Sequence, residues 1–426
     1  MKRLRIALVI DDIYPASSGV GRSVQTQLEE LTALGHQVTL LAPATGLEPP
    51  QGITTIALPS WRLPGLPRHT SIVRCSRRFA RQLARQHQFD IIHSQTDTGA
   101  LLLSARLARQ LGIPHVHTFH TNMAGAHRTQ PILTCLSSLG YRLVAYMLAG
   151  AHRTRPQRAG RITLPGESAI ARFDWRSQAI VAQAVTAVTT PSHYMLRYIR
   201  TAAGPVSITG TTIPTGYNRT FQRILQRTHR RRTGTGLRFV SISRLVKEKR
   251  LGRVISAFTK ANIPGSELVI IGDGQERSRL ETKAKLKLKG LRGAHKPSIT
   301  FTGQVQRLED IAQALRDADA FVLASYRFDN QPIVIPESLA AGLPVLYCDD
   351  RLDVGLSPTN SLLVGPSIKQ LAAGMQQLAD DSTRHTLATG AQHALADLSP
   401  EATATAYCQL YRQVLQQHTT TPRKPQ

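Results

Sequence analysis

Short strand-like segments alternate with longer helical segments through the first half of the chain. The strand-like segments occupy residues 4–10, 37–42, 90–93 and 115–118. Between them, residues 21–34 carry apolar side chains at helical spacing, and residues 101–111 form a second helical stretch that Gly112 and Pro114 end. This alternation predicts a doubly wound parallel sheet.

The same alternation restarts in the second half. Strand-like segments recur at residues 237–243, 268–272, 298–302, 320–324 and 345–348. Helical segments begin at 275, 308 and 336, and a last one spans 400–417. We therefore predict an α/β protein with two Rossmann-like domains, residues 1–204 and 205–399. The 400–417 helix is able to pack back on the first domain, and the polar tail at 418–426 is expected to be disordered. Ligands are expected in a cleft between the carboxyl ends of two such sheets.

Composition excludes several classes of protein. The hydrophobic fraction of 41% is too high for a disordered chain. No run approaches the roughly 20 apolar residues of a membrane span, and residues 6–10 are too short for the apolar core of a signal peptide. The four cysteines have no metal-binding or redox spacing, so a reduced, cytoplasmic setting is expected.

Positive charge is concentrated in the first part of the chain. The net charge is +26, and residues 1–250 hold 34 basic and 10 acidic residues, against 19 and 17 in residues 251–426. Such an excess favours a polyanion or an anionic membrane as partner. A basic surface without a partner is the alternative. The arginine clusters lack interleaved aromatic residues and any recognisable nucleic-acid module, so no nucleic acid is expected.

Two motifs of the first domain have open interpretations. Gly19 and Gly21 follow the first strand and open a helix, which suits the approach of a phosphate. A nicotinamide site would need an acid at the end of the second strand, and none is there. His115, His117 and His120 suggest either a metal site or, as we prefer, a single histidine, His120, at the end of a strand.

Basic residues and glycines follow two strands of the second domain. Arg244 and Lys249 come after its first strand, where they can neutralise a diphosphate or simply form a surface charge pair. Gly272 and Gly274 end the next strand and allow a nucleotide to pack closely against backbone.

Acidic residues form two further patterns there. Asp329 and Glu337 lie eight residues apart around Pro332, which can occupy the first turn of a helix. A carboxylate such as Glu337 suits a ribose diol, whereas a helix cap and a helix-face acid are the alternative. Asp317 and Asp319 resemble a metal-binding pair, but a solvated helix end explains them better.

Taken together, these residues resemble the retaining nucleotide-sugar glycosyltransferases of family four, which have the GT-B fold. Ten short segments match in order along nearly the whole chain. They lie at residues 15–21, 35–39, 90–93, 112–121, 190–192, 213–216, 243–249, 272–274, 301–303 and 329–344.

The resemblance implies a role for each candidate residue. Arg244 and Lys249 would neutralise the diphosphate, Glu337 would hold the ribose, and Asp329 would contact the donor sugar. The backbone amides of Ile333 and Val334 would bind phosphate. His120 would face the transferred sugar, and Gly19 would lie near the phosphates or the acceptor. The donor would be a UDP-sugar or GDP-mannose, no cofactor or catalytic metal would be needed, and the configuration of the sugar would be retained.

Four positions depart from the family pattern. Asp329 replaces the usual glutamate, Pro332 a glycine, Ser243 a glycine, and Asn218 an aspartate. These departures leave the donor and the rate open, and they make a weakly active binding or scaffold protein the alternative of another class.

The acceptor is suggested by residues 58–85. Ile72, Val73, Phe79 and Leu83 can share one side of a helix. Basic residues would cover its other side: Arg74, Arg77, Arg78, Arg81 and Arg85. Such a helix can lie on anionic lipid, although an ordinary helix that covers the sheet is the alternative.

Within the family, this region is most similar to enzymes that glycosylate diacylglycerol or phosphatidylinositol. We therefore expect a peripheral enzyme at the inner face of the plasma membrane that makes a glycolipid. A soluble sugar, a polysaccharide or a protein is the alternative acceptor.

Overall fold

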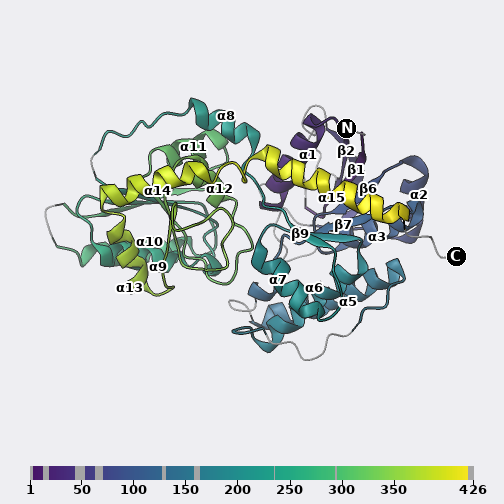
Figure 1. The fold of residues 1–426 in the computed structure, drawn as a ribbon. Coiled ribbons are helices and arrows are strands. Elements are labelled where there is room, and N and C mark those ends of the chain that lie inside the picture. Colours follow the sequence, from purple (N-terminus) through teal and green to yellow (C-terminus); the bar gives the residue numbers. More distant parts are fainter. Residues whose placement is uncertain are drawn as a thin grey trace. The chain divides into compact units, whose positions relative to one another are not determined.

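The computed structural model divides the chain into two compact units. It describes residues 3–12, 19–43, 53–62, 71–126, 131–157, 164–234, 236–292 and 295–420. Unit 1 comprises residues 1–215 and 400–426, and unit 2 comprises residues 216–399 (Figure 1). Each unit is built around one parallel sheet, as the alternating sequence pattern predicts.

The sheet of unit 1 has seven parallel strands in the order β3-β2-β1-β6-β7-β8-β9. Its strands are β1 (Arg5–Val9), β2 (Gln37–Pro43), β3 (Thr54–Leu58), β6 (Ile91–Ser94), β7 (His115–Thr118), β8 (Ala187–Thr190) and β9 (Gly210–Thr212). A separate antiparallel pair joins β4 (Ser60–Trp61) to β5 (Ile72–Val73). The predicted helix through Ile72 and Val73 is therefore wrong, because these residues pair as a strand and the helix begins at Arg77.

Helices of unit 1 pack around three apolar clusters. The helices are α1 (Gly19–Ala33), α2 (Arg77–Gln86), α3 (Gly99–Leu111), α4 (Met123–Ala126), α5 (Pro131–His152), α6 (Ala169–Ala184), α7 (His193–Ala203) and α15 (Pro400–Thr420). Helices α1 and α15 share a core with β1, and they lie side by side in Figure 1. Helices α2 and α3 share a second core, and α3 with α5, α6 and α7 shares a third. The predicted end of α3 is confirmed, because Gly112 adopts a left-handed conformation there.

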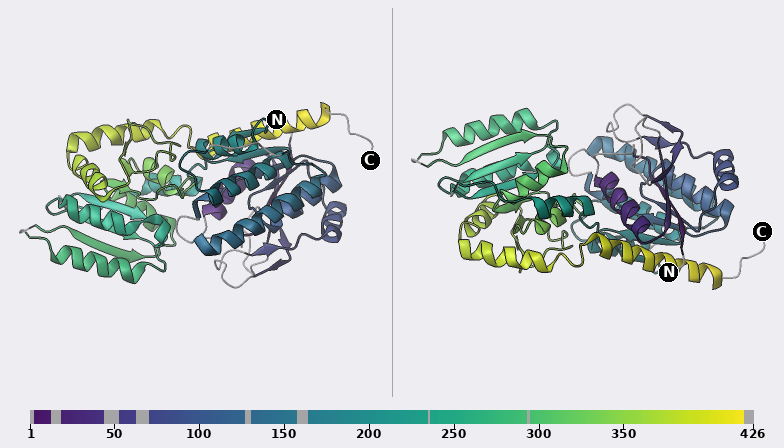
Figure 2. Two further views of the ribbon diagram at one scale, coloured as in Figure 1. Left: turned by 90° about the horizontal axis from the view of Figure 1, so that it is seen from below. Right: turned by 90° about the horizontal axis from the view of Figure 1, so that it is seen from above.

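The sheet of unit 2 has six parallel strands in the order β12-β11-β10-β13-β14-β15. Its strands are β10 (Arg238–Ile242), β11 (Glu267–Ile271), β12 (Ser298–Gly303), β13 (Ala320–Val322), β14 (Val345–Tyr347) and β15 (Ser361–Leu363). The helices are α8 (Arg219–Arg227), α9 (Leu251–Ala261), α10 (Arg277–Lys289), α11 (Leu308–Arg316), α12 (Val334–Ala340), α13 (Ile368–Gln377) and α14 (Asp381–His393), with a short 3₁₀ turn at Lys247–Lys249. Figure 2 shows helices on both faces of this sheet.

The boundaries of the units differ from those expected at two places. Residues 205–215 belong to unit 1, because β9 pairs with β8 and extends the first sheet. The last helix continues to Thr420, three residues into the segment expected to be a tail. Residues 421–426 lie outside the described part. Helix α15 packs on unit 1 through Tyr407, Tyr411 and Val414, which join the apolar cluster around β1.

Candidate active site

A largely buried ion pair marks the point where the strand order of the second sheet reverses. Strand β10 lies between β11 and β13, so the connections that follow β10 and β13 leave the sheet in different directions. Lys249 lies in the 3₁₀ turn after β10, and Asp329 lies in the loop after β13. The Lys249 Nζ atom is 2.6 Å from Asp329 Oδ1, and the two side chains are only 13% and 10% exposed. The ammonium also lies 5.8 Å from the centre of the Phe328 ring. The structure thus brings together two of the predicted site residues.

Arg244 lies on the same connection as Lys249 but points to solvent. It follows β10 by two residues, and its backbone carbonyl accepts a hydrogen bond from Val246 N at 3.0 Å. Its side chain is exposed and forms no ion pair with a residue in the described part of the chain. Its guanidinium is therefore available to an anion that approaches this loop.

The two glycines after β11 hold the Arg244 loop in place. Gly272 and Gly274 have φ angles of +138° and +156°, and Cβ atoms at these positions would lie 1.9 Å from Ser243 O and 2.5 Å from Leu245 O. The loops are joined by a hydrogen bond from Leu245 N to Asp273 O, 2.9 Å long. The chain's own backbone therefore accounts for both glycines, which were expected to accommodate a nucleotide.

Glu337 is fully buried in the first turn of α12, at 0% exposure. Pro332 precedes the helix by two residues, so the expectation that it occupies the first turn is wrong; its carbonyl instead accepts a hydrogen bond from Ile335 N at 3.0 Å. No described residue accepts a hydrogen bond from the amides of Ile333 or Val334. A carboxylate and two backbone amides thus come from one short segment.

Sequence reasoning missed a second buried ion pair after β14. The fully buried Asp349 carboxylate lies 3.1 Å from Arg351 Nε and also accepts a hydrogen bond from Arg327 N. Arg327 has a φ of +55° and lies two residues before Asp329. Asp349 therefore fixes the loop that carries Asp329. The sequence signal that could have revealed Asp349 is its position as an acid directly after an apolar strand.

The expectation that Asp317 and Asp319 form a solvated helix end is wrong. The Asp319 side chain is 15% exposed and forms ion pairs with Arg230 at 2.7 Å and Arg232 at 3.0 Å. Asp317 accepts hydrogen bonds from the backbone amides of Arg231 and Arg232. The two acids therefore hold the arginine segment 230–232 against the turn between α11 and β13.

In unit 1, Asp11 organises the corresponding point of the first sheet, after β1. It accepts hydrogen bonds from Val73 N and Ala100 N, at 2.9 and 3.0 Å, and from the hydroxyl groups of Thr96 and Thr98, at 2.8 Å each. Its burial raises the pKa of the carboxyl group. The sequence showed this acid at a strand end but gave no sign of its partners. Gly19 begins α1, and a Cβ atom there would meet open space.

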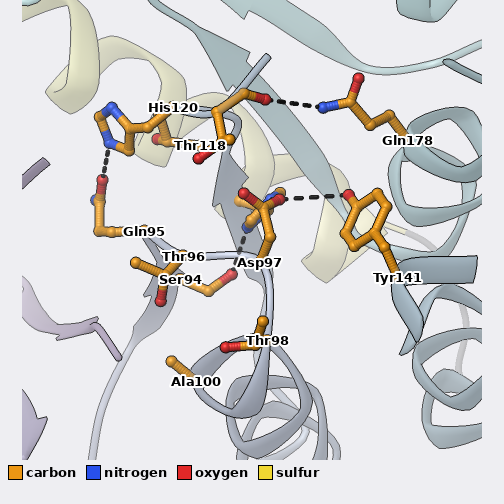
Figure 3. Close-up of polar contacts among 12 residues, drawn as sticks. Ser94, Gln95, Thr96, Asp97, Thr98, Ala100, Thr118, His120, Tyr141 and Gln178 are labelled. Atoms are coloured by element: carbon orange, nitrogen blue, oxygen red, sulfur yellow. Dashed lines mark hydrogen bonds and ion pairs between the residues drawn. The ribbon is translucent and has the colours of Figure 1, made fainter. Parts of the chain in front are cut away.

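His120 lies two residues after β7 and contacts Gln95. Its Nε2 atom is 2.8 Å from Gln95 Oε1 (Figure 3). Gln95 in turn donates to Gln27 Oε1 at 2.8 Å. Burial lowers the pKa of His120 to about 4. The imidazole is therefore neutral near pH 7, and it can donate or accept a hydrogen bond but carries no positive charge.

The neighbouring histidines belong to a hydrogen-bonded chain. The contacts run from His152 to His115 at 2.9 Å, from His115 to Ser94 at 2.8 Å, from Ser94 to His117 at 2.8 Å, and from His117 to Asp97 at 3.2 Å. Tyr141 donates to the same Asp97 oxygen at 3.3 Å (Figure 3). His115 and His117 thus contact Ser94, while His120 contacts Gln95. The described residues include no group of acids, cysteines and histidines placed to hold a metal ion.

Two family profiles match the chain, one for each unit. "Glycosyltransferase Family 4" matches residues 17–221, and "Glycosyl transferases group 1" matches residues 236–381. The chain belongs to glycosyltransferase family four. The two matched segments cover most of the glycosyltransferase and contain all the site residues that were predicted from the sequence.

Curated relatives share about a quarter of their residues with this glycosyltransferase. The alpha-monoglucosyldiacylglycerol synthase of Streptococcus pneumoniae is 27% identical over 80% of the chain and 70% of its own length. A GDP-mannose-dependent alpha-mannosyltransferase of Mycolicibacterium smegmatis is 25% identical over 81% of the chain and 80% of its own length.

Solved structures share its GT-B fold. Sucrose-phosphate synthase from Thermosynechococcus elongatus superposes with a TM-score of 0.69 at 20% identity, covering 97% of this chain and all of that one. Anabaena HepE in complex with UDP superposes with a TM-score of 0.68 at 14% identity, covering 96% of this chain and all of that one. At these identities the likeness establishes the fold and no more.

Proposed function

We propose that this glycosyltransferase moves a hexose from a nucleotide diphosphate sugar to a lipid acceptor at an anionic membrane surface, with retention of configuration. The observation that carries the proposal is the largely buried Lys249–Asp329 pair at the reversal of strand order in unit 2. In open α/β sheets, ligands bind at this point, outside the carboxyl ends of the strands. The names of the relatives, a glucosyldiacylglycerol synthase and GDP-mannose-dependent mannosyltransferases, support the donor and acceptor classes.

Unit 2 supplies the groups that a nucleotide sugar needs. Lys249 and the exposed guanidinium of Arg244 neutralise the diphosphate, and the amides of Ile333 and Val334 donate hydrogen bonds to it. Glu337 accepts hydrogen bonds from the ribose hydroxyl groups. Asp329 contacts the donor sugar, and in the absence of donor its carboxylate keeps the Lys249 ammonium in position.

The reaction itself is a substitution at the anomeric carbon. The bond between that carbon and the diphosphate oxygen breaks, and a bond to the acceptor oxygen forms on the same face of the sugar. The acceptor proton passes to the departing phosphate oxygen. The developing negative charge is stabilised by Lys249 and Arg244, so that no catalytic metal is required. His120, being neutral, acts as a hydrogen-bond partner for the sugar.

A lipid acceptor is supported by the surface of unit 1 as well as by the relatives. Arg74, Arg77, Arg78 and Arg81 are all exposed. They lie on or next to α2, whose apolar residues Ala80 and Leu83 are buried in the core of the unit. The apolar side of α2 therefore packs on the unit as an ordinary covering helix does. Its basic side remains available to anionic lipid. No helix in the described part of the chain is long and apolar enough to cross a membrane.

The test is a transfer assay with purified protein, labelled UDP-glucose or GDP-mannose, and vesicles that contain diacylglycerol or phosphatidylinositol. The proposal expects a glycolipid with one of these donors, and NMR of the anomeric proton should show the donor's configuration. Glycosylation of a soluble sugar but of no lipid would overturn the acceptor class. Donor binding in a thermal-shift assay, without transfer or hydrolysis, would point to a binding protein instead.

A further inference from the structure

Helix α5 exposes a row of large apolar side chains. In the described part of the chain, nine large hydrophobic residues are exposed, and five of them lie on this helix. They are Leu136 (71% exposed), Leu139 (61%), Leu143 (61%), Tyr146 (47%) and Met147 (40%). Their spacing of three, four, three and one residues places them on one face of a helix. We call this row the α5 stripe.

The opposite face of α5 is buried in unit 1. Tyr141, Ala145, Leu148 and Ala149 join the apolar cluster formed with α3, α6 and α7. The helix is therefore apolar on both sides, although only one side has a protein partner among the described residues. Helices that are apolar all round are normally enclosed by protein or by lipid.

Charge around the stripe is positive. Residues 131–152 contain no acid and no lysine. Their one arginine, Arg142, is directed at α6, where it donates to Ser177 Oγ at 2.8 Å and to Phe173 O at 2.7 Å. At the C-terminal end of the helix, Arg153 and Arg155 are exposed. Arg109 of α3 is also exposed there and donates to Ala151 O at 3.3 Å.

Helix α3 packs against both α5 and α2 (Figure 1). Helices α2 and α5 expose different kinds of side chain. The apolar side of α2 is already used in the core, so α2 offers a membrane only its arginines, whereas the α5 stripe offers apolar side chains without an acid among them. An interfacial helix needs both an apolar face and nearby cations.

We propose that the α5 stripe is the surface that inserts into an anionic bilayer, while the arginines of α2 and those at the end of α5 contact lipid phosphates. This inference rests on the proposed function and names the part of unit 1 that binds the membrane. A second copy of the chain suits the stripe less well. A stable interface takes about 20–30 residues from each partner, many more than one row of five, and a second copy carries the same net charge of +26.

The experiment measures co-sedimentation of the full chain with vesicles of phosphatidylcholine, with and without phosphatidylglycerol. A Leu139→Ser/Leu143→Ser variant removes apolar groups without changing charge. It should bind the anionic vesicles at least about tenfold more weakly than the unchanged protein, because two of the inserting side chains are lost. A matched Leu286→Ser variant should bind unchanged, since Leu286 is 66% exposed but lies on α10 of unit 2.

A fluorescent variant tests insertion directly. Tyr146→Trp places an indole in the stripe, and its emission should shift to the blue and be quenched by brominated lipid when anionic vesicles are added. Emission that does not change while the protein sediments with the vesicles would overturn the inference.

The outcomes separate this inference from the proposed function. If the serine double variant binds anionic vesicles as well as the unchanged protein does, the stripe is not the inserting surface, and the proposed glycolipid synthesis is untouched. If the unchanged protein binds no vesicles and glycosylates only soluble acceptors, both proposals fail. Conversion of a dimer into a monomer by the double variant, measured by light scattering, would assign the stripe to a second copy and also overturn the inference. Thermal stabilisation by the nucleotide sugar should be equal in all these variants, which confirms that they are folded.

Discussion

The chemistry proposed for the donor site depends on one ammonium group. Lys249 is only 13% exposed and its charge is balanced by Asp329, whereas Lys247, two residues earlier on the same turn, is exposed. A buried cation near a departing diphosphate stabilises negative charge far better than one in water. The two lysines therefore form a matched pair for mutation.

Lys249→Ala should lower kcat/KM for sugar transfer by about 10²–10³-fold, the usual loss for one preorganised group that stabilises transition-state charge. Lys247→Ala should change it less than about threefold, since exposed charges act weakly through water. Steady-state kinetics with the preferred nucleotide sugar make the comparison. Equal losses in both variants would contradict the role given to Lys249.

The histidines of unit 1 make its stability depend on pH. Burial lowers the pKa of His152 to about 4 and that of His120 to about 4. In the unfolded chain, histidine titrates near pH 6.5, so at lower pH the unfolded state binds protons that the folded state does not. Each of these histidines should therefore lower the free energy of unfolding by about 2 kcal/mol when the pH falls from 7 to 5.

His152→Gln should flatten this dependence, because glutamine cannot take up a proton yet can still hydrogen-bond to His115 Nδ1, which lies 2.9 Å from the imidazole of His152. Urea denaturation at pH 7, 6 and 5 measures the slope. The control is His385→Gln, an exposed position in unit 2. A slope that stays unchanged in His152→Gln would show that this histidine is not buried as a neutral group.

Among the structural elements, two neighbouring loops of unit 2 leave no room for a side chain between them. The loop after β10 carries Arg244, and it approaches the loop after β11 so closely that a Cβ atom at Gly272 would lie 1.9 Å from Ser243 O. Gly272 also has a φ of +138°, which side-chain-bearing residues rarely adopt.

Gly272→Ala should therefore destabilise unit 2 by about 3 kcal/mol or more, through strain and displacement of the Ser243 loop. It should also weaken donor binding, because Arg244 moves with that loop. Gly290→Ala is the control: Gly290 has a φ of −76° at the end of α10, and the nearest atom to its Cβ would be Lys287 O at 3.6 Å. Thermal unfolding with and without UDP-glucose measures both effects, and equal unfolding midpoints in the two variants would contradict the argument.

Elements with a strong apolar period could be predicted from the sequence, and those set by tertiary partners could not. The strands around residues 4–10 and 237–243, and the end of α3 at Gly112, follow from local pattern. Strand β5 has only two residues, and its position is fixed by pairing with β4 and by the bond from Val73 N to Asp11. Strand β9 is polar, so only its hydrogen bonds to β8 reveal it.

For the candidate site, the residue types could be predicted from the sequence and their roles from the family resemblance, but the contacts between them could not. Lys249 and Asp329 are 80 residues apart, and their pairing follows from the order of the strands. Asp349 was missed because its partners, Arg327 N and Arg351, are determined by folding of two loops. The chain that links His152 to Asp97 draws on three separate segments, which no local pattern connects.

At the scale of the whole molecule, the order of the chain differs from the order of its folded units. Unit 2 is inserted between residue 215 and Pro400, and α15 then completes the core of unit 1. Tyr411 is fully buried in that core, and its hydroxyl group lies 2.7 Å from His93 Nδ1. The stability of unit 1 therefore depends on a helix that is synthesised only after unit 2.

Tyr411→Ala should destabilise unit 1 by about 3 kcal/mol or more, because it leaves a large cavity beneath α15, whereas Tyr411→Phe loses one hydrogen bond and should cost about 1 kcal/mol. Calorimetry with and without UDP-glucose tests which unit responds. The donor binds unit 2 in our proposal, so it should raise the unfolding temperature of unit 2 by the same amount in the unchanged protein and in both variants. In Tyr411→Ala, the transition of unit 1 should move to lower temperature, and the donor should raise it less than it raises that of unit 2, because unit 1 contributes His120 to the sugar in our proposal whereas unit 2 binds the diphosphate and the ribose. If donor binding were lost together with the stability of unit 1, the two units could not be treated as separate folding units, and unit 2 would not supply most of the donor affinity.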